Sequence, residues 1–141
     1  MFAADAPAQS QVREKRIEQA AVQFAEAYRA KNLSVLDAAR LIRGSVKVVI
    51  GYASADETEI PDTIRRFPSF RALQLWLADR SEKGVDNPNW YVQKNVSCLR
   101  GRCSFDDDEG SLHNRLYLSE IVYGYRNGRP FIKEIHLWNG D

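Results

Sequence analysis

Residues 115–138 carry the sequence RLYLSEIVYGYRNGRPFIKEIHLW, in which two apolar strand patterns flank Asn127-Gly128. Both central positions of a tight hairpin turn need a positive φ, and Asn-Gly is a pair that adopts it readily. The pattern therefore predicts a hairpin with strands 115–125 and 131–138, in which Arg126 faces Arg129. The same register pairs Tyr123 with Ile132, Ile121 with Glu134, Ser119 with His136, and Tyr117 with Trp138.

This register divides the predicted hairpin into an aliphatic and an aromatic face, because successive side chains of a strand point to opposite sides. Both faces are too apolar for open water, so we expect helices to cover the aliphatic face and a partner or ligand to contact the other. The aliphatic face contains Leu116, Leu118, Val122, Phe131, Ile135 and Leu137, interrupted by Glu120 and Lys133. The aromatic face contains Tyr117, Ile121, Tyr123, Tyr125, Ile132 and Trp138, with Ser119, Glu134 and His136.

The length and charge of the chain limit what it does. Its 141 residues fit a single domain, which we place at 10–141. Its 20 basic and 19 acidic side chains nearly cancel, so nothing in the net charge favours a nucleic-acid partner. No apolar run approaches the roughly 20 residues that span a bilayer, and we expect no membrane span.

The N-terminal residues 1–9 are rich in alanine, contain Pro7 and show no helical or strand periodicity. They predict a disordered leader. The run from Phe2 to Ala6 also resembles the small-residue border that remains where a secretory signal peptide is cut. We therefore expect a periplasmic or secreted protein, and the alternative is an ordinary N-terminus on a cytoplasmic chain.

The two cysteines, Cys98 and Cys103, enclose the four residues 99–102, which include Gly101. A hairpin there places the cysteines directly opposite each other and Val96 opposite Phe105. This favours a disulfide, which would stabilise the fold by about 2 kcal/mol for so short a loop. The alternatives are two reduced thiols or a redox or metal centre; the last lacks both Cys-x-x-Cys spacing and a second ligand pair.

Helices are predicted where apolar residues recur at three- and four-residue steps, at 10–31, 34–42 and 70–83. Ser34 and Asp37 form a capping-box pattern for the second helix, and Ser69 is the expected N-cap of the third. Further strands are predicted at 46–52, 63–67 and 90–98. The fold class is α+β, with three helices packed on one strongly curved, mostly antiparallel sheet. The expected core face bears Val46, Val48, Trp90, Val92, Val96, Leu118, Ile135 and Leu137.

Metal sites are not expected. The acidic run 106–109 does not reproduce the alternating carboxylates of a calcium loop, and a solvated turn is the preferred interpretation. The only histidines, His113 and His136, are far apart in the sequence, which argues against zinc. No phosphate loop or dinucleotide fingerprint occurs, so no cofactor is expected.

Two segments carry a resemblance to a known family. Residues 24–33, FAEAYRAKNL, precede a short capped helix, and NGR at 127–129 precedes IKEIHLW at 132–138. Together with the element order over about residues 10–138, they resemble the nuclear transport factor 2-like superfamily, which includes ketosteroid isomerase, polyketide cyclases and many non-catalytic binding domains. The resemblance implies a conical fold that encloses a pocket, often as a dimer through the sheet. Because this fold supports unrelated functions, it does not fix the activity.

An isomerase or cyclase on this fold would need a carboxylate as general acid or base in an apolar pocket. Glu120 is one candidate, because burial on the aliphatic face would raise its pKa; the preferred interpretation is a rim ion pair with the diagonal Lys133. Glu134 is the other, near His136 and Tyr123; the preferred interpretation is a solvated or interface polar pair.

We therefore expect a non-catalytic domain that binds an apolar small molecule or a protein partner, the latter a second copy or another protein. The alternative is a cofactor-independent isomerase, lyase or cyclase. The contiguous aromatic face resembles an interface core more than a solvated sheet, and the same side chains would line the pocket if the faces were reversed. The predicted binding residues are Tyr117, Tyr123, Tyr125, Ile132 and Trp138.

Overall fold

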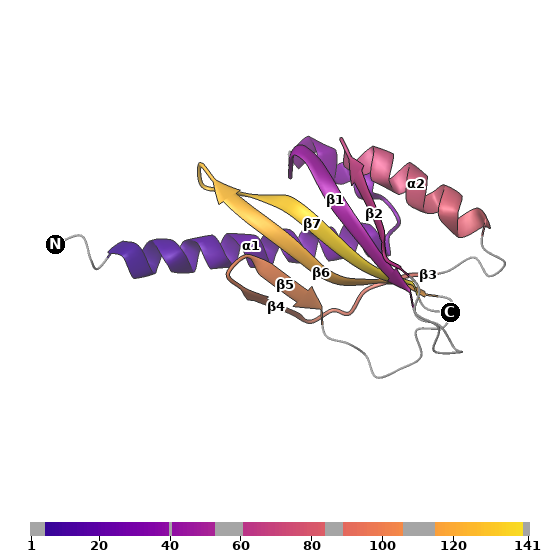
Figure 1. The fold of residues 1–141 in the computed structure, drawn as a ribbon. Helices are drawn as coiled ribbons and strands as arrows, with labels where there is room; N and C mark the ends of the chain where they lie inside the picture. Colours follow the sequence, from indigo (N-terminus) through magenta and orange to yellow (C-terminus); the bar gives the residue numbers. More distant parts are fainter. Residues whose placement is uncertain (1–4, 40, 53–60, 84–88, 106–114, 140–141) are drawn as a thin grey trace.

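The computed structural model of the chain describes residues 5–39, 41–52, 61–83, 89–105 and 115–139. These form three helices and a seven-stranded mixed sheet, which confirms the α+β class (Figure 1). The helices are α1 (Asp5–Arg29), the 3-10 helix η2 (Leu33–Ala39) and α2 (Phe70–Lys83). The strands are β1 (Ile42–Tyr52), β2 (Thr63–Phe67), β3 (Asn89–Tyr91), β4 (Val96–Leu99), β5 (Arg102–Phe105), β6 (Arg115–Arg126) and β7 (Arg129–Asn139).

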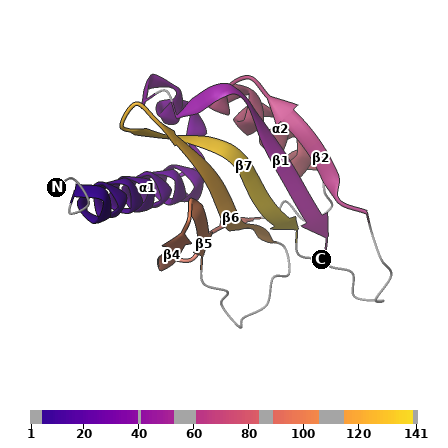
Figure 2. The ribbon, with the colours of Figure 1, turned by 60° about the vertical axis from the view of Figure 1, so that its left-hand side comes forward.

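The sheet is centred on the C-terminal hairpin. Its strand order is β2-β1-β7-β6-β5-β4, and β3 pairs with β6 outside this path. The β1–β7 and β3–β6 pairs are parallel, and the others are antiparallel. The sheet curves from β2 at one edge to β4 at the other, and α1 runs behind β6 and β7 while α2 lies beside β2 (Figures 1 and 2).

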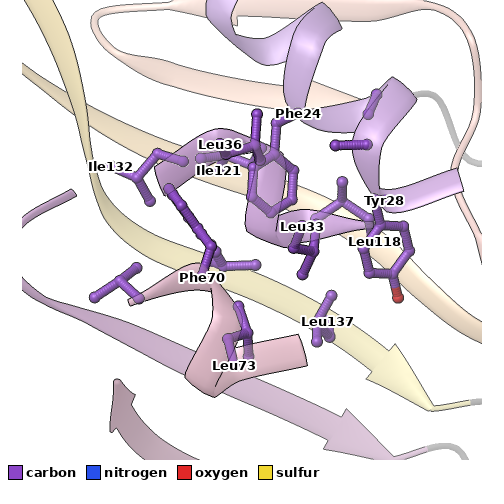
Figure 3. Packing of buried hydrophobic residues seen from close by; sticks show 14 of the residues in the cluster. Phe24, Tyr28, Leu33, Leu36, Phe70, Leu73, Leu118, Ile121, Ile132 and Leu137 are labelled. Carbon is purple, nitrogen blue, oxygen red and sulfur yellow. The ribbon is translucent and has the colours of Figure 1, made fainter. Parts of the chain in front are cut away.

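One hydrophobic core joins the helices to one face of the sheet. The buried side chains of α1 include Ile17, Ala21, Phe24 and Tyr28, which are the four residues whose spacing predicted the helix. They pack with Leu33, Leu36, Phe70 and Leu73 of the other helices and with Leu118, Ile121, Ile132 and Leu137 of the hairpin (Figure 3). The expected core residues are confirmed: Val46, Val48, Trp90, Val92, Leu118, Ile135 and Leu137 are buried, and Val96 is partly buried.

The turn of the central hairpin is the predicted one. Asn127 and Gly128 have φ angles of 53° and 75°, and Arg126 faces Arg129. The pairs of Tyr123 with Ile132 and of Tyr117 with Trp138 also form as predicted.

Between those two pairs the register differs from the prediction. Ile121 pairs with Ile135 instead of Glu134. The partner of His136 is Glu120 instead of the predicted Ser119. The register shifts because β7 has one extra residue at Lys133, and β6 has one extra residue at Ser119, which restores the register.

These two irregularities change which side chains enter the core. A strand with an extra residue moves the following side chains to the opposite face. As a result Ile121, Tyr123 and Ile132, which we predicted on the aromatic face, lie in the same core as Leu118 and Leu137. The prediction of two uniform faces was therefore wrong near the middle of the hairpin.

Helix α1 begins earlier than predicted. It starts at Asp5, so residues 5–9, which we expected in a disordered leader, are helical. Alanine is the strongest helix former, and a proline in the first turn removes an N–H that has no intrahelical acceptor. These two effects account for a helix without apolar periodicity at its start.

Two further local predictions need correction. The single strand predicted at 90–98 is interrupted, because β3 ends at Tyr91 and β4 starts at Val96. The predicted capping role of Asp37 within its own helix is replaced by one between helices: Asp37 accepts hydrogen bonds from the backbone N–H groups of Phe70 and Arg71. Ser69 is the N-cap of α2 as predicted, since its Oγ accepts from the N–H of Ala72 at 3.0 Å.

Candidate binding groove

A groove of about 680 Å³ lies between the first half of α1 and the β4–β5 hairpin, and we call it the α1–β4 groove. Its volume is within the range of small-molecule sites, roughly 300 to 1,000 Å³. Figure 1 shows the β4–β5 hairpin beside α1 and next to β6. The lining residues are Ser10, Arg13, Glu14 and Ile17 of α1, Cys98, Leu99, Arg100 and Gly101 of the hairpin, and Tyr123 and Tyr125 of β6.

Tyr123 lines this groove from β6 and carries a buried hydroxyl. Its side chain is 5% exposed, and its buried hydroxyl has no hydrogen-bond partner among the described residues. Burial raises the pKa of Tyr123 well above its ordinary value, so the hydroxyl keeps its proton and stays a donor. A buried hydroxyl without a partner costs about 1 to 3 kcal/mol, which a ligand with an acceptor oxygen would offset.

The turn of the β4–β5 hairpin holds the backbone of Tyr123 in place. The N–H of Tyr123 donates to the carbonyl of Gly101 at 2.7 Å. A Cβ at Gly101 would lie 2.7 Å from the carbonyl oxygen of Tyr123, so only glycine allows this close approach.

The disulfide closes the same hairpin. Cys98 and Cys103 are bonded and are direct cross-strand partners, with their Cα atoms 4.0 Å apart. The predicted disulfide is thus confirmed, as is the pairing of Val96 with Phe105. Because Cys98 lines the groove, the disulfide forms part of its apolar wall.

Tyr125 forms the groove wall nearest the tip of the β6–β7 hairpin. Its hydroxyl accepts a hydrogen bond of 3.1 Å from Nη1 of Arg16. The same guanidinium donates to the carbonyl of Gly128 at 2.8 Å. Arg16 therefore ties α1 to the hairpin tip and fixes the spacing of the groove walls.

Charged side chains surround the opening. Arg13 and Arg100 are exposed, and Glu14 is half-buried. Neither arginine has an ion-pair partner within the described part of the chain. Arg13 and Glu14 do not stand out in the sequence, because the charged first turns of α1 look like an ordinary solvated helix face.

Two other hollows have similar volumes. One of about 690 Å³ lies at the tip of the β6–β7 hairpin, and one of about 780 Å³ lies along the outside of α1. The described chain has two buried polar side-chain atoms without a hydrogen-bond partner, on Tyr123 and His136, and neither residue lines these hollows. The α1–β4 groove is therefore the better candidate.

Glu120, the first predicted catalytic carboxylate, lies away from the groove. It is on the face of the sheet opposite the helices, and it forms an ion pair with Arg102 of β5 rather than the predicted one with Lys133. Arg102 pairs with Val122, two residues after Glu120 on the same strand, and this places it within reach of Glu120, while Lys133 is exposed. Glu120 is therefore not an isolated carboxylate in an apolar pocket.

Glu134 and His136, the other catalytic candidates, also lie on this outer face. Glu134 Oε1 is 3.5 Å from Nζ of Lys47 and 3.7 Å from Nε2 of His136. The second distance is too long for a hydrogen bond, which agrees with the unpartnered Nε2 of His136. Tyr123 is in the core on the opposite face, so the predicted proximity of Glu134 to Tyr123 was wrong.

The five predicted binding residues do not form one patch. Ile132 is in the core, while Tyr123 and Tyr125 line the groove. Tyr117 is buried, and its hydroxyl donates to the carbonyl of Phe105 at 2.9 Å. Trp138 alone is on the open outer face, 38% exposed. The two extra strand residues separate the set, because they move its middle members to the helix side.

Comparisons with protein families, with curated proteins and with solved structures find no match for this chain. None of the described helices is both long and apolar enough to cross a membrane. The described residues also bring no three His, Cys, Asp or Glu side chains together as a metal site; the acidic run 106–109 and His113 lie outside the described residues. The assignment of function therefore depends on the geometry of the groove.

Proposed function

We propose that the chain is a nuclear transport factor 2-like domain that binds a small, mostly apolar molecule in the α1–β4 groove and performs no chemistry on it. Two helices before the first strand, a third between β2 and β3, and a first strand that pairs with the last support the family resemblance. The unpartnered hydroxyl of Tyr123 is the observation that carries the proposal, because it is a buried donor without an acceptor on a residue that lines the groove.

The groove combines two kinds of contact for such a ligand. Ile17, Tyr125 and the disulfide provide apolar surface, and burial of ligand surface against them drives binding at roughly 25 cal/mol per Å² before the costs of association. The Tyr123 hydroxyl then fixes the orientation by donating to a carbonyl or ether oxygen. This division between apolar walls and few placed polar groups is typical of small-molecule sites.

A cofactor-independent isomerase or lyase in the same groove is the alternative. It would need a carboxylate as proton shuttle, and Glu14 is the only carboxylate among the described lining residues. Glu14 lies half-buried near two arginines rather than in an apolar pocket, which favours the non-catalytic function. Conversion of a bound ligand that Glu14→Gln abolishes would reverse this preference.

The outer face of the sheet is a candidate for a second binding surface. Trp138 and Ile64 are 38% and 58% exposed there, on strands whose opposite face packs against the helices. We propose that a second copy of the chain covers this surface.

A periplasmic or secreted location is also proposed, because a disulfide persists best in an oxidising compartment.

The groove function can be tested by a fragment screen with NMR detection on the full chain. Neutral aromatic ketones and ethers are expected to shift the amide signals of Ile17, Gly101 and Tyr123. Tyr123→Phe should weaken binding about fivefold to tenfold, the loss of one hydrogen bond. Tyr28→Phe is the matched control, because its buried hydroxyl donates to the carbonyl of Leu116 at 2.6 Å, outside the groove. Fragments that bind both variants equally, or bind elsewhere, would contradict the proposal.

A further inference from the structure

Resting on the proposed function, we infer that the ligand of the α1–β4 groove is an amphipathic monoanion: an apolar aromatic body that carries a neutral acceptor oxygen and ends in one carboxylate. The body lies against Ile17 and Tyr125, and its neutral oxygen accepts from the Tyr123 hydroxyl. The carboxylate lies at the opening between Arg13 and Arg100.

The charges at the opening point to an anion. Arg13 comes from α1 and Arg100 from the β4–β5 turn, so each of the two elements that enclose the groove contributes an arginine to its lining. No described carboxylate forms an ion pair with either arginine. A planar guanidinium with its fork of N–H donors suits a carboxylate, which it binds through two parallel hydrogen bonds.

The backbone at Arg100 supports a role for its side chain. Arg100 and Gly101 have φ angles of 53° and 82°, nearly those of Asn127 and Gly128 in the other hairpin turn, 53° and 75°. This turn favours asparagine or glycine at its first position, and the other hairpin has asparagine there. An arginine held in the left-handed region is a strained choice, and strain of this kind concentrates at functional positions.

The balance of charge limits the ligand to a single negative charge. The described lining contains two arginines and one carboxylate, Glu14, which leaves one net positive charge. Glu14 would repel a phosphate dianion or a polyanion, whereas one carboxylate between two guanidiniums balances the site. The buried donor, in contrast, is the neutral hydroxyl of Tyr123, which suits an uncharged oxygen because burying a charge there would be costly.

Three probes separate these contacts by isothermal titration calorimetry on the full, disulfide-bonded chain. 4-Benzoylbenzoate carries the aromatic body, the ketone and the carboxylate. 4-Benzoylbenzamide removes the negative charge, and 4-benzylbenzoate replaces the ketone by a methylene. We expect 4-benzoylbenzoate to bind most tightly and each of the others to bind about fivefold more weakly.

Variants then assign each loss to a side chain. Arg100→Asn, which keeps a residue suited to the turn, and Arg13→Gln should each weaken 4-benzoylbenzoate about fivefold and leave the benzamide within about twofold. Tyr123→Phe should weaken both ketones and leave 4-benzylbenzoate unchanged. Arg129→Gln is the matched control: it removes an exposed arginine at the tip of the β6–β7 hairpin that does not line the groove, and it should leave all three probes unchanged.

The outcomes distinguish this inference from the proposed function. Equal affinity for the benzoate and the benzamide, or no effect of Arg13→Gln and Arg100→Asn, overturns the carboxylate assignment, while Tyr123-dependent binding of the benzamide keeps the groove function. Equal effects of Arg129→Gln and Arg100→Asn mean non-specific attraction and also overturn it. Binding of none of the probes at millimolar concentration to the folded chain overturns the inference, and failure of the neutral fragments as well overturns the proposed function.

Discussion

Asp37 and Gln74 cap each other's helices. The carboxylate of Asp37 in η2 accepts the backbone N–H groups of Phe70 and Arg71 at 2.9 and 3.1 Å, at the start of α2. In return, Oε1 of Gln74 in α2 accepts the backbone N–H groups of Leu33 and Ser34, at the start of η2. The first N–H groups of a helix have no acceptor within it, so each side chain satisfies the other helix.

We expect Asp37→Ala to lower the free energy of unfolding by about 1 to 2 kcal/mol, because it leaves the N–H groups of Phe70 and Arg71 without their acceptor. Denaturant unfolding followed by circular dichroism measures the change. Ser34→Ala is the control: the capping-box pattern gives Ser34 the larger role, whereas its hydroxyl bonds only the exposed side chain of Asn32 at 2.9 Å in the described contacts. A larger loss from Ser34→Ala than from Asp37→Ala would contradict this assignment.

Two buried tyrosines, Tyr28 and Tyr123, should respond differently when their hydroxyls are removed. Tyr28 donates to the carbonyl of Leu116 at 2.6 Å, so Tyr28→Phe should lower the free energy of unfolding by about 1 kcal/mol. Tyr123→Phe removes a buried hydroxyl without a partner and should leave stability unchanged or raise it. Thermal and urea unfolding of both variants without ligand test this. A loss of similar size for both would mean that the Tyr123 hydroxyl is satisfied within the fold and is no site for a ligand.

Alkaline pH should destabilise the protein through the same two residues. Burial raises the pKa of Tyr28 and of Tyr123 well above the ordinary value near 10. Above about pH 10 the unfolded chain therefore releases phenolic protons that the folded chain retains, and the free energy of unfolding falls as pH rises. Urea unfolding at pH 8 and pH 11 should show a smaller fall for the double variant Tyr28→Phe, Tyr123→Phe than for the natural sequence. An equal fall would show that other groups cause it.

Local signals predicted much of this fold. The Asn127-Gly128 turn, the paired cysteines and the apolar positions of α1 were predictable, because each depends on a few neighbouring residues. The extra residues at Lys133 and Ser119 were not, because an irregularity in a strand shows no pattern of its own, and the fit of the helices against the sheet selects it.

The groove was harder to predict than the fold. Its walls come from α1, the β4–β5 hairpin and β6, and their proximity depends on long-range packing. Tyr123 and Tyr125 were predicted as binding residues, and the structure places both in the groove, although on the helix side of the sheet. The one sequence signal for the opening was Arg100, which precedes Gly101 where a hairpin turn favours asparagine.

The disulfide should stabilise the fold modestly. Its loop is short, with a sequence separation of 5, so the entropic contribution is about 2 kcal/mol. The double variant Cys98→Ser, Cys103→Ser should lose about that amount in urea unfolding and keep its circular dichroism spectrum. Mass spectrometry after alkylation without reductant should find no free thiol in protein from its native compartment; two alkylated cysteines would contradict the bond.

The proposed contact between two copies makes a prediction about Trp138. Its ring lies over Gly51 on the outer face, where a Cβ at position 51 would come within 2.6 Å of two ring atoms. Trp138 pairs with Gly51, and Val49, two residues earlier on the same strand, pairs with Ile64, so the three apolar side chains share this face. A large, partly exposed aromatic side chain of this kind typically dominates an interface.

We expect light scattering to give twice the chain mass for the natural sequence and the single mass for Trp138→Ala. Leu118→Ala is the contrasting variant: its position is fully buried in the core, so it should cost about 2 to 5 kcal/mol of stability, whereas Trp138→Ala should leave the free energy of unfolding of the single chain within about 0.5 kcal/mol. A single-chain mass for the natural sequence at micromolar concentration would leave the outer face without a second copy.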